Sequence, residues 1–337
     1  MKKILIIKIA AIGDVVMSLA MLERIDKVYP NAEITWVCGK IVEPVLREVK
    51  RINKLIVINE KKLLSGNYFQ KLSVLSEIWK KLFNQKYDLV VNGHSDKRYN
   101  LLNLTVRKLK FKKYIQNSGR TIIPGRYYAA DYAKLIDGVD DYKMTPAVLP
   151  KLVVDVPEKD ILLSKMKGKK VILNPAGAKN LLNGGEVRRW PIEYYVKLAE
   201  DLIKSHVNVI IVGNENDKWI DEYFQGLSVL NLTGDSNLLD LLCLYNNSDL
   251  FITHDTGPFH LAKLTNVKIL ALFGPTLPYS FFNHPDEQVS TLWKGDELTC
   301  SPCYNGKSFA DCNNNICMKN LSVEEVTRTA KSMLKIV

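Results

Sequence analysis

The fold is decided by the stretch Leu250-Phe251-Ile252-Thr253-His254-Asp255-Thr256-Gly257-Pro258-Phe259-His260-Leu261-Ala262. Its apolar residues predict a strand over Leu250–Thr253, and Pro258 suits the first turn of a helix over Pro258–Leu264. A helix that starts at the carboxyl end of a strand presents unpaired amide groups, which bind anions. A lone histidine is more often a packed structural residue, but the neighbours of this one favour a ligand. The residues that we expect to face that ligand are Asp255, Thr256, Gly257 and His260.

Strands alternate with helices on both sides of this stretch, which predicts parallel sheets with helices on both faces, an α/β fold. The expected strands are Lys3–Ile9, Glu33–Val37, Leu55–Ile58, Leu89–Asn92, Lys170–Asn174, Val207–Gly213, Leu250–Thr253 and Lys268–Phe273. The expected helices include Asp14–Val28, Pro191–Ser205, Leu238–Asn246 and Ser322–Ile336, the last with a capping box of Ser322 and Glu325.

The chain has 337 residues, which suggests two domains. Pro146, Pro150 and Pro157 mark a linker over residues 144–158. We therefore predict domains over residues 1–150 and 158–320, with a C-terminal helix over 321–337. In two such domains the ligand would bind in the cleft between the carboxyl ends of the sheets. The fingerprint G-x-G-x-x-G is absent, which disfavours a dehydrogenase.

A second constellation follows the strand Lys170–Asn174. The loop Asn174-Pro175-Ala176-Gly177-Ala178 consists of small residues, which let a phosphate or a sugar approach the backbone. It leads to Arg188-Arg189-Trp190-Pro191, where two arginines near a helix start can hold a diphosphate. Surface arginines beside a packing tryptophan remain the alternative.

A third constellation closes the first strand, with Lys8 followed by Gly13-Asp14. We expect Gly13 to allow a sharp turn and Asp14 to open the next helix. The alternative is a simple helix start, where a carboxylate is favourable at the positive end of the helix dipole.

Four cysteines, Cys300, Cys303, Cys312 and Cys317, are spaced C-x2-C-x8-C-x4-C. Four thiolates can hold structural zinc or iron. Unliganded cysteines or a reversible disulfide remain open.

The net charge of +11 is concentrated in one half of the chain. Residues 1–150 hold 27 Lys and Arg against 14 Asp and Glu, and the remainder holds 20 against 22. The densest stretch is Arg107-Lys108, Lys110 and Lys112-Lys113, followed by Arg120 and Arg126. A basic half favours an anionic partner, although solvated lysines are the alternative. No nucleic-acid-binding module is apparent, and no apolar run suggests a signal peptide or a membrane span.

These constellations together resemble glycosyltransferase family 9, the ADP-heptose:lipopolysaccharide heptosyltransferases. The resemblance covers nearly the whole chain. It includes Lys8…Gly13-Asp14, Asn174-Pro175…Arg189-Trp190-Pro191, Asp255-Thr256-Gly257-Pro258…His260-Leu261-Ala262 and Leu272-Phe273-Gly274-Pro275-Thr276. It implies a GT-B fold with an N-terminal acceptor domain and a C-terminal donor domain. It also implies inversion at the anomeric centre without a catalytic metal. The loop Ala178–Val187 is longer than is usual in the family.

The resemblance also implies roles for the residues. Asp14 would be the base, and Arg188 or Arg189 would stabilise the leaving diphosphate with the amides near Thr256 and Gly257. Lys8 and Gly13 would contact the acceptor. The donor ADP-heptose would be bound by Asn174, Gly177, Arg188, Arg189, Glu215 (at the ribose), Asp255, Thr256, Gly257 and His260.

The implied acceptor is an anionic glycolipid of the lipopolysaccharide core. A cytoplasmic enzyme would then act at the inner face of the inner membrane, with no nucleic-acid partner. One alternative is a glycosyltransferase of the same fold with another acceptor, such as a protein, or with another nucleotide sugar. A second alternative is a non-catalytic protein that binds a sugar nucleotide or a nucleic acid.

Overall fold

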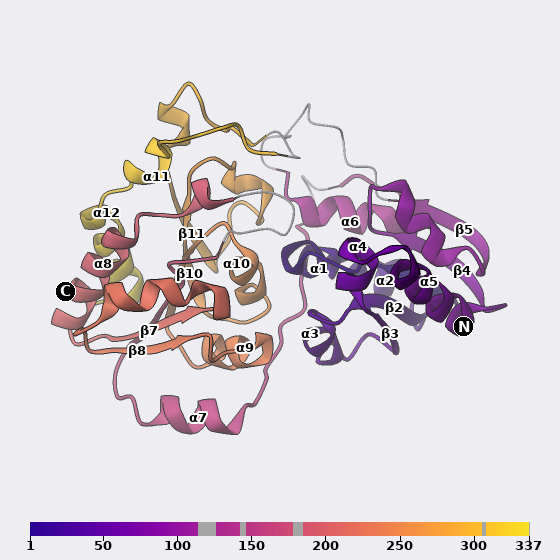
Figure 1. Ribbon diagram of the computed structural model, residues 1–337, viewed down its shortest axis with the longest axis horizontal. Coiled ribbons are helices and arrows are strands. Elements are labelled where there is room, and N and C mark those ends of the chain that lie inside the picture. The colour runs from indigo at the N-terminus through magenta and orange to yellow at the C-terminus, as the bar shows by residue number, and fades with distance from the viewer. Residues whose placement is uncertain (114–125, 142–145, 178–184, 305–307, 337) are drawn as a thin grey trace. The chain divides into compact units, whose positions relative to one another are not determined.

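The computed structural model describes residues 1–113, 126–141, 146–177, 185–304 and 308–336. The chain forms two compact units, and Pro150 and Lys151 lie on either side of the boundary between them. Each unit is a parallel sheet with helices packed on it (Figure 1). Of the predicted features, residues 144–145 of the linker, residues 178–184 of the loop Ala178–Val187, and Arg120 lie outside the described ranges.

The sheet of the first unit has the order β3-β2-β1-β4-β5, and every described strand pair is parallel. The chain proceeds outward from β1 to β2 and β3 on one side, and to β4 and β5 on the other. The strand order therefore reverses between β1 and β4, and open α/β sheets bind ligands at the carboxyl ends of the strands beside such a reversal. The strands are β1 (Lys3–Ile7), β2 (Glu33–Gly39), β3 (Lys54–Ile58), β4 (Lys86–Asn92) and β5 (Arg107–Lys113).

Helices cover this sheet because their apolar faces bury against it. On one face, Val74, Ile78 and Leu82 of α5 join Leu5 and Ile7 of β1 in a buried cluster. Asn67 starts α5 with a capping box that includes Gln70. The helices are α1 (Ile12–Ser18), α2 (Ala20–Val28), α3 (Glu43–Arg47), α4 (Glu60–Ser65), α5 (Tyr68–Leu82) and α6 (Tyr128–Asp137), with the 3₁₀ helix η1 (Lys97–Asn103).

The first predicted helix differs from the structure. A single helix over Asp14–Val28 is wrong, because α1 ends at Ser18 and α2 begins at Ala20. The Ser18 hydroxyl donates a hydrogen bond to the Val15 carbonyl at 2.7 Å, a bond back onto the helix that favours a bend. Gly13 lies in the first turn of α1 without a positive φ, so the expected sharp turn does not depend on it.

The lysine-rich stretch Arg107–Lys113 was not expected to be a strand, yet it forms β5 at the edge of the sheet. Lysines at a sheet edge prevent it from pairing with another chain.

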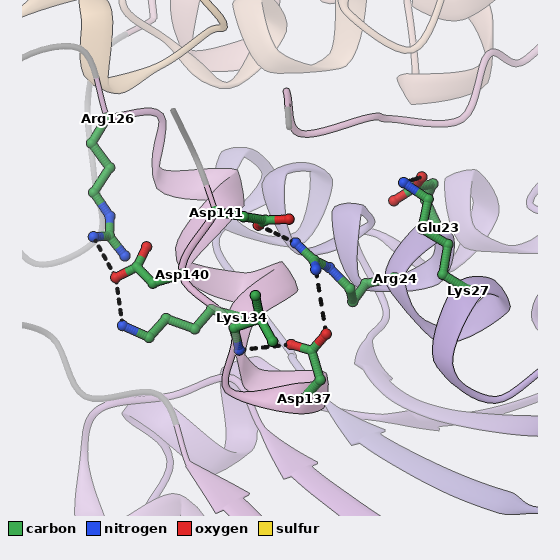
Figure 2. A network of polar contacts seen from close by, with 9 residues as sticks. Glu23, Arg24, Lys27, Arg126, Lys134, Asp137, Asp140 and Asp141 are labelled. Atoms are coloured by element: carbon green, nitrogen blue, oxygen red, sulfur yellow. Dashed lines mark hydrogen bonds and ion pairs between the residues drawn. The ribbon is translucent and has the colours of Figure 1, made fainter. Parts of the chain in front are cut away.

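Arg126 lies outside β5, shortly before α6. It ion-pairs with Asp131 and, as Figure 2 shows, with Asp140, so its charge is neutralised within the unit.

The second unit has a six-stranded sheet of order β11-β10-β9-β6-β7-β8, again with parallel pairs. Its strand order reverses between β6 and β9. Two of its strands, β8 and β11, were not among those expected. The strands are β6 (Lys170–Leu173), β7 (Asn208–Gly213), β8 (Val229–Thr233), β9 (Leu250–His254), β10 (Lys268–Phe273) and β11 (Val289–Trp293).

The last helix, α12, belongs to the core of the second unit. Val326, Ala330 and Leu334 pack with residues of α8 in one buried cluster. Ser322 caps α12 by accepting from the Glu325 amide at 3.1 Å, but the Glu325 carboxylate pairs with Lys294, so the described contacts complete only half of the expected capping box. The helices are α7 (Pro157–Ser164), α8 (Ile192–Lys204), α9 (Leu238–Asn246), α10 (Gly257–Ala262), α11 (Ile316–Lys319) and α12 (Val323–Leu334). The 3₁₀ helices are η2 (Glu186–Arg188), η3 (Glu215–Phe224), η4 (Pro278–Ser280) and η5 (Gly295–Glu297).

Within the described ranges, no helix combines the length and the apolar character that crossing a membrane requires.

Candidate functional site

In the first unit, Asp14 lies at the reversal point of the sheet with two partners. Lys8 follows β1, and its ammonium nitrogen is 3.7 Å from one Asp14 oxygen. The Tyr132 hydroxyl, from α6, donates to the other Asp14 oxygen at 3.1 Å. The Asp14 side chain is 45% exposed, so a carboxylate held on two sides still reaches solvent.

Lys8 is buried, although the resemblance implied that it would contact the acceptor. Its ammonium donates to the Gly93 carbonyl at 3.1 Å and lies 5.2 Å from the centre of the Tyr132 ring. Burial lowers the pKa of Lys8, and the Asp14 carboxylate opposes that shift. Lys8 is therefore a buried ion-pair partner of Asp14 rather than a surface cation.

His94, which the sequence analysis missed, follows β4 at the same sheet edge. Its Nε2 accepts from the Ile9 amide at 3.0 Å, so a neutral ring carries its proton on Nδ1. Its ring stacks on Tyr99 with centroids 3.8 Å apart. Burial, with Lys8 as a second cause, holds the pKa of His94 well below its usual value. A polar residue directly after the predicted strand Leu89–Asn92 was the available signal.

Ion pairs surround the end of α6, the helix that carries Tyr132 (Figure 2). Arg24 of α2 pairs with Asp137 and Asp141 at the end of α6. Lys134 pairs with Asp140 at 2.6 Å. No local motif marks Tyr132, because it lies 118 residues from Asp14 in the sequence.

In the second unit, Asn174 and Thr256 meet at the reversal point between β6 and β9. The Asn174 side-chain amide donates to the hydroxyls of Thr253 and Thr256 at 3.2 and 3.4 Å. Thr256 precedes α10, which begins at Gly257 and has six residues. So short a helix adds little dipole, so any anion bound at this edge would have its charge offset mainly by the nearby arginines.

Arg188 is buried beside Asp255, which excludes the surface-arginine alternative for this residue. Its guanidinium donates to the Asp255 carbonyl at 2.8 Å and lies 3.5 Å from the Asp255 carboxylate. The Thr276 hydroxyl donates to the same carboxylate at 3.1 Å. Phe309 lies under the guanidinium, 5.2 Å from it. The structure therefore brings Arg188, Asp255 and Thr276 together at one edge of the sheet.

Arg189 and Gly177 form a second arginine contact at this edge. Arg189 donates to the Gly177 carbonyl at 2.8 Å and lies 5.4 Å from the Trp219 ring. The Gly177 amide donates to Asp217 at 3.2 Å. Gly177 has a φ of +82°, a conformation that other residues adopt only with strain. Asp217 and Trp219 are additions that the sequence did not single out.

His260 is buried, and its Nδ1 has no hydrogen-bond partner among the described residues. Burial, followed by Lys263 and Arg188, holds the pKa of His260 well below its usual value. Glu215 differs, because its exposed carboxylate pairs with Lys218 at 2.8 Å after β7. No described contact links Glu215 to Asn174 or Arg188.

The four clustered cysteines do not form a metal site in the described residues, where no three His, Cys, Asp or Glu side chains lie close enough to hold an ion. Cys300 and Cys312 are exposed, whereas Cys317 is buried. Burial raises the pKa of Cys317 to about 11, so this thiol is protonated near neutral pH. The described residues therefore hold no preformed ion site, and structural zinc or iron at these four cysteines stays a proposal.

Comparisons with known proteins agree with this architecture. The model of "Glycosyltransferase family 9 (heptosyltransferase)" matches residues 119–312. The lipopolysaccharide core heptosyltransferase OpsX of Haemophilus influenzae is 25% identical over 86% of this chain and 84% of its own length. A family 9 glycosyltransferase of Veillonella parvula has a TM-score of 0.76 at 20% identity, covering 99% of this chain and 97% of its own. E. coli ADP-heptose lps heptosyltransferase II has a TM-score of 0.74 at 19% identity, with 99% of both chains covered.

The two parallel-sheet units and the likeness to these solved structures define a GT-B fold. The family match covers more than half of the chain and includes Asn174, Arg188 and Asp255. The chain belongs to glycosyltransferase family 9.

Proposed function

We propose that this enzyme transfers a heptose from ADP-heptose to an anionic lipopolysaccharide core acceptor, with inversion at the anomeric carbon. The observation that carries the proposal is the Asp14 carboxylate, which a buried ammonium and a tyrosine hydroxyl hold at the reversal point of the first sheet. The names of similar proteins, OpsX and ADP-heptose lps heptosyltransferase II, support the donor and the acceptor class.

The first unit, residues 1–150, is proposed to bind the acceptor. Asp14 takes the proton of the acceptor hydroxyl while that oxygen forms a bond to the anomeric carbon. Tyr132 and Lys8 orient the carboxylate and offset its charge, because both contact it directly. Gly13, next to Asp14 in α1, places the backbone beside the acceptor.

The second unit is proposed to bind the donor and to receive the electron pair of the breaking bond on the diphosphate. Arg188, with support from Arg189 and the amides near Gly257, would stabilise that negative charge. Asn174, Gly177, Asp255 and Thr256 form the rest of the diphosphate edge, and His260 offers its unpartnered Nδ1. Glu215 lies after β7 and is the proposed contact for the ribose hydroxyls. No metal takes part in the proposed displacement.

The acceptor would be a lipid-linked glycan, so we place the reaction at the cytoplasmic face of the inner membrane. The excess of Lys and Arg in residues 1–150 supports an anionic acceptor.

Transfer assays with a panel of nucleotide sugars test the proposal. ADP-heptose should be the preferred donor, and the new glycosidic bond should have the anomeric configuration opposite to that of the donor by NMR. Transfer from another nucleotide sugar, or to a protein instead of a core glycolipid, would establish another transferase of the same fold. Retention of configuration would show that the reaction is not a single displacement, and it would refute Asp14 as the base of such a step.

A further inference from the structure

Exposed apolar side chains concentrate in one part of the first unit. Among the large hydrophobic residues that are exposed, eight fall within residues 68–111, including all three exposed phenylalanines. Contiguous apolar exposure of this kind marks an interaction surface. We name these residues the 68–111 patch: Tyr68, Phe69, Leu72, Phe83, Leu101, Leu104, Leu109 and Phe111.

The residues of the patch on α5 share one flank of the helix. Tyr68, Phe69 and Leu72 lie within about 100° of one another around the axis, with Trp79 among them, and Phe83 follows the last residue of the helix. The Trp79 indole donates to the Leu101 carbonyl at 2.6 Å, which sets this flank against η1. The Thr105 hydroxyl donates to the Trp79 carbonyl, which ties the segment after Leu104 to the same flank.

Strand β5 continues the same surface. Leu109 and Phe111 alternate with lysines and so share one side of the strand. Phe111 pairs with Val90, which belongs to the buried cluster with α5, so this is the side of the sheet that carries α5. Lys108 connects η1 to β5, because its ammonium donates to Asn103 and lies 5.2 Å from the Phe111 ring.

The surroundings of the patch are strongly cationic. Residues 68–113 hold 11 Lys and Arg against three Asp and Glu. Each of those three acids is paired, Glu77 with Lys81, Asp88 with Lys2 and Asp96 with Arg98. Lys80, Lys86 and Lys110 make no ion pair within the described ranges. Exposed aromatic and leucine side chains among unpaired lysines are the pattern of a surface that inserts into an anionic bilayer.

We propose that the 68–111 patch is a membrane-docking surface, whose apolar side chains enter the interface of an anionic lipid bilayer while its lysines contact the headgroups. The inference deepens the proposed function, because it rests on a lipid-linked acceptor for its purpose. A protein partner fits less well, because lysine is depleted at protein interfaces. Nucleic acid fits less well too, because stacking on bases needs aromatic rings and half of the patch is leucine.

Vesicle flotation of the full chain tests the proposal with lipid alone, using neutral phosphatidylcholine vesicles and vesicles with added phosphatidylglycerol. Phe69→Ser/Leu109→Ser should lower the partition coefficient on anionic vesicles at least tenfold, because these side chains are 78% and 80% exposed and their loss leaves the core intact. Val153→Ser/Ile161→Ser is the matched control, since these exposed residues of the second unit should change nothing. Lys80→Glu/Lys110→Glu should remove the preference for anionic vesicles.

Equal binding by the parent and the Phe69→Ser/Leu109→Ser variant would overturn the docking surface, as would equal binding to neutral and anionic vesicles. Tighter binding to single-stranded DNA than to vesicles, lost in the same variant, would assign the patch to nucleic acid. Calorimetric binding of ADP and thermal unfolding should stay at parental values in all variants. Because the vesicles contain no glycolipid acceptor, a failed transferase assay would not affect this result.

Discussion

Replacing Asp14 by Asn tests two consequences of the Asp14 site in one variant. If Asp14 is the base, transfer should slow by ~10²-fold or more, which corresponds to ~3 kcal/mol in the barrier. The change also leaves the Lys8 ammonium buried without its anion. At an effective dielectric constant of about 20, charges 3.7 Å apart attract by about 4 kcal/mol. The exposure of Asp14 reduces this, and we expect a loss of ~1–2 kcal/mol in the free energy of unfolding.

A double variant separates the two effects. Lys8→Met/Asp14→Asn removes both charges, so its unfolding free energy should recover most of the loss, measured by urea denaturation. Its transfer rate, measured with saturating donor and acceptor, should stay as low as that of Asp14→Asn. Near-parental transfer by Asp14→Asn would refute the assignment of the base. Recovery of activity together with stability in the double variant would show that Asp14 serves only the fold.

Three further outcomes are expected. Arg188→Ala should weaken ADP binding by at least tenfold in calorimetry, whereas Arg328→Ala on α12 should leave it unchanged; equal affinities would move the donor site elsewhere. Burial, then Arg188 and Arg189, lower the pKa of His254 to about 3, so the folded state stays neutral while the unfolded state gains a proton below pH ~6.5. The neutral His254 therefore contributes to the free energy of unfolding above that pH, and this contribution falls by ~2 kcal/mol by pH 5. The unfolding free energy of His254→Asn should depend less on pH than that of the parent, and an equal pH dependence would contradict this. Protein purified without chelators should contain less than one equivalent of zinc or iron, because no three of these side chains lie close enough to hold an ion in the described residues; a full equivalent lost in Cys303→Ser would establish the metal site.

The fold was predictable because its signal is local. Each half alternates apolar runs with helical segments, and strands such as β10 were placed with their observed bounds. The strand β5 was missed because lysines dominate its composition and six of its seven residues are exposed, so it lacks the apolar alternation of a half-buried strand. At the end of α1, the Ser18 hydroxyl is hydrogen-bonded back onto the helix, a local contact that periodicity does not detect.

The candidate site was predictable where motifs follow strands. Asn174, Asp255 and Asp14 each follow a strand directly or by a short turn, so their places at the sheet edges follow from the topology. Tyr132 could not be found, because its contact with Asp14 depends on how α6 packs and on the ion pairs of Arg24. The burial of Lys8 could not be predicted either, because the sequence after a strand does not distinguish a lysine with a solvated ammonium from one with a buried ammonium.

The most direct test of the central claim is mass spectrometry of a lipopolysaccharide core acceptor after incubation with the purified enzyme and ADP-heptose. The account predicts that the acceptor gains the mass of one heptosyl residue, that ADP appears in equal amount, and that Asp14→Asn forms neither product at a comparable rate. An unchanged acceptor with intact ADP-heptose, under conditions in which the enzyme is folded and binds ADP, would contradict the account.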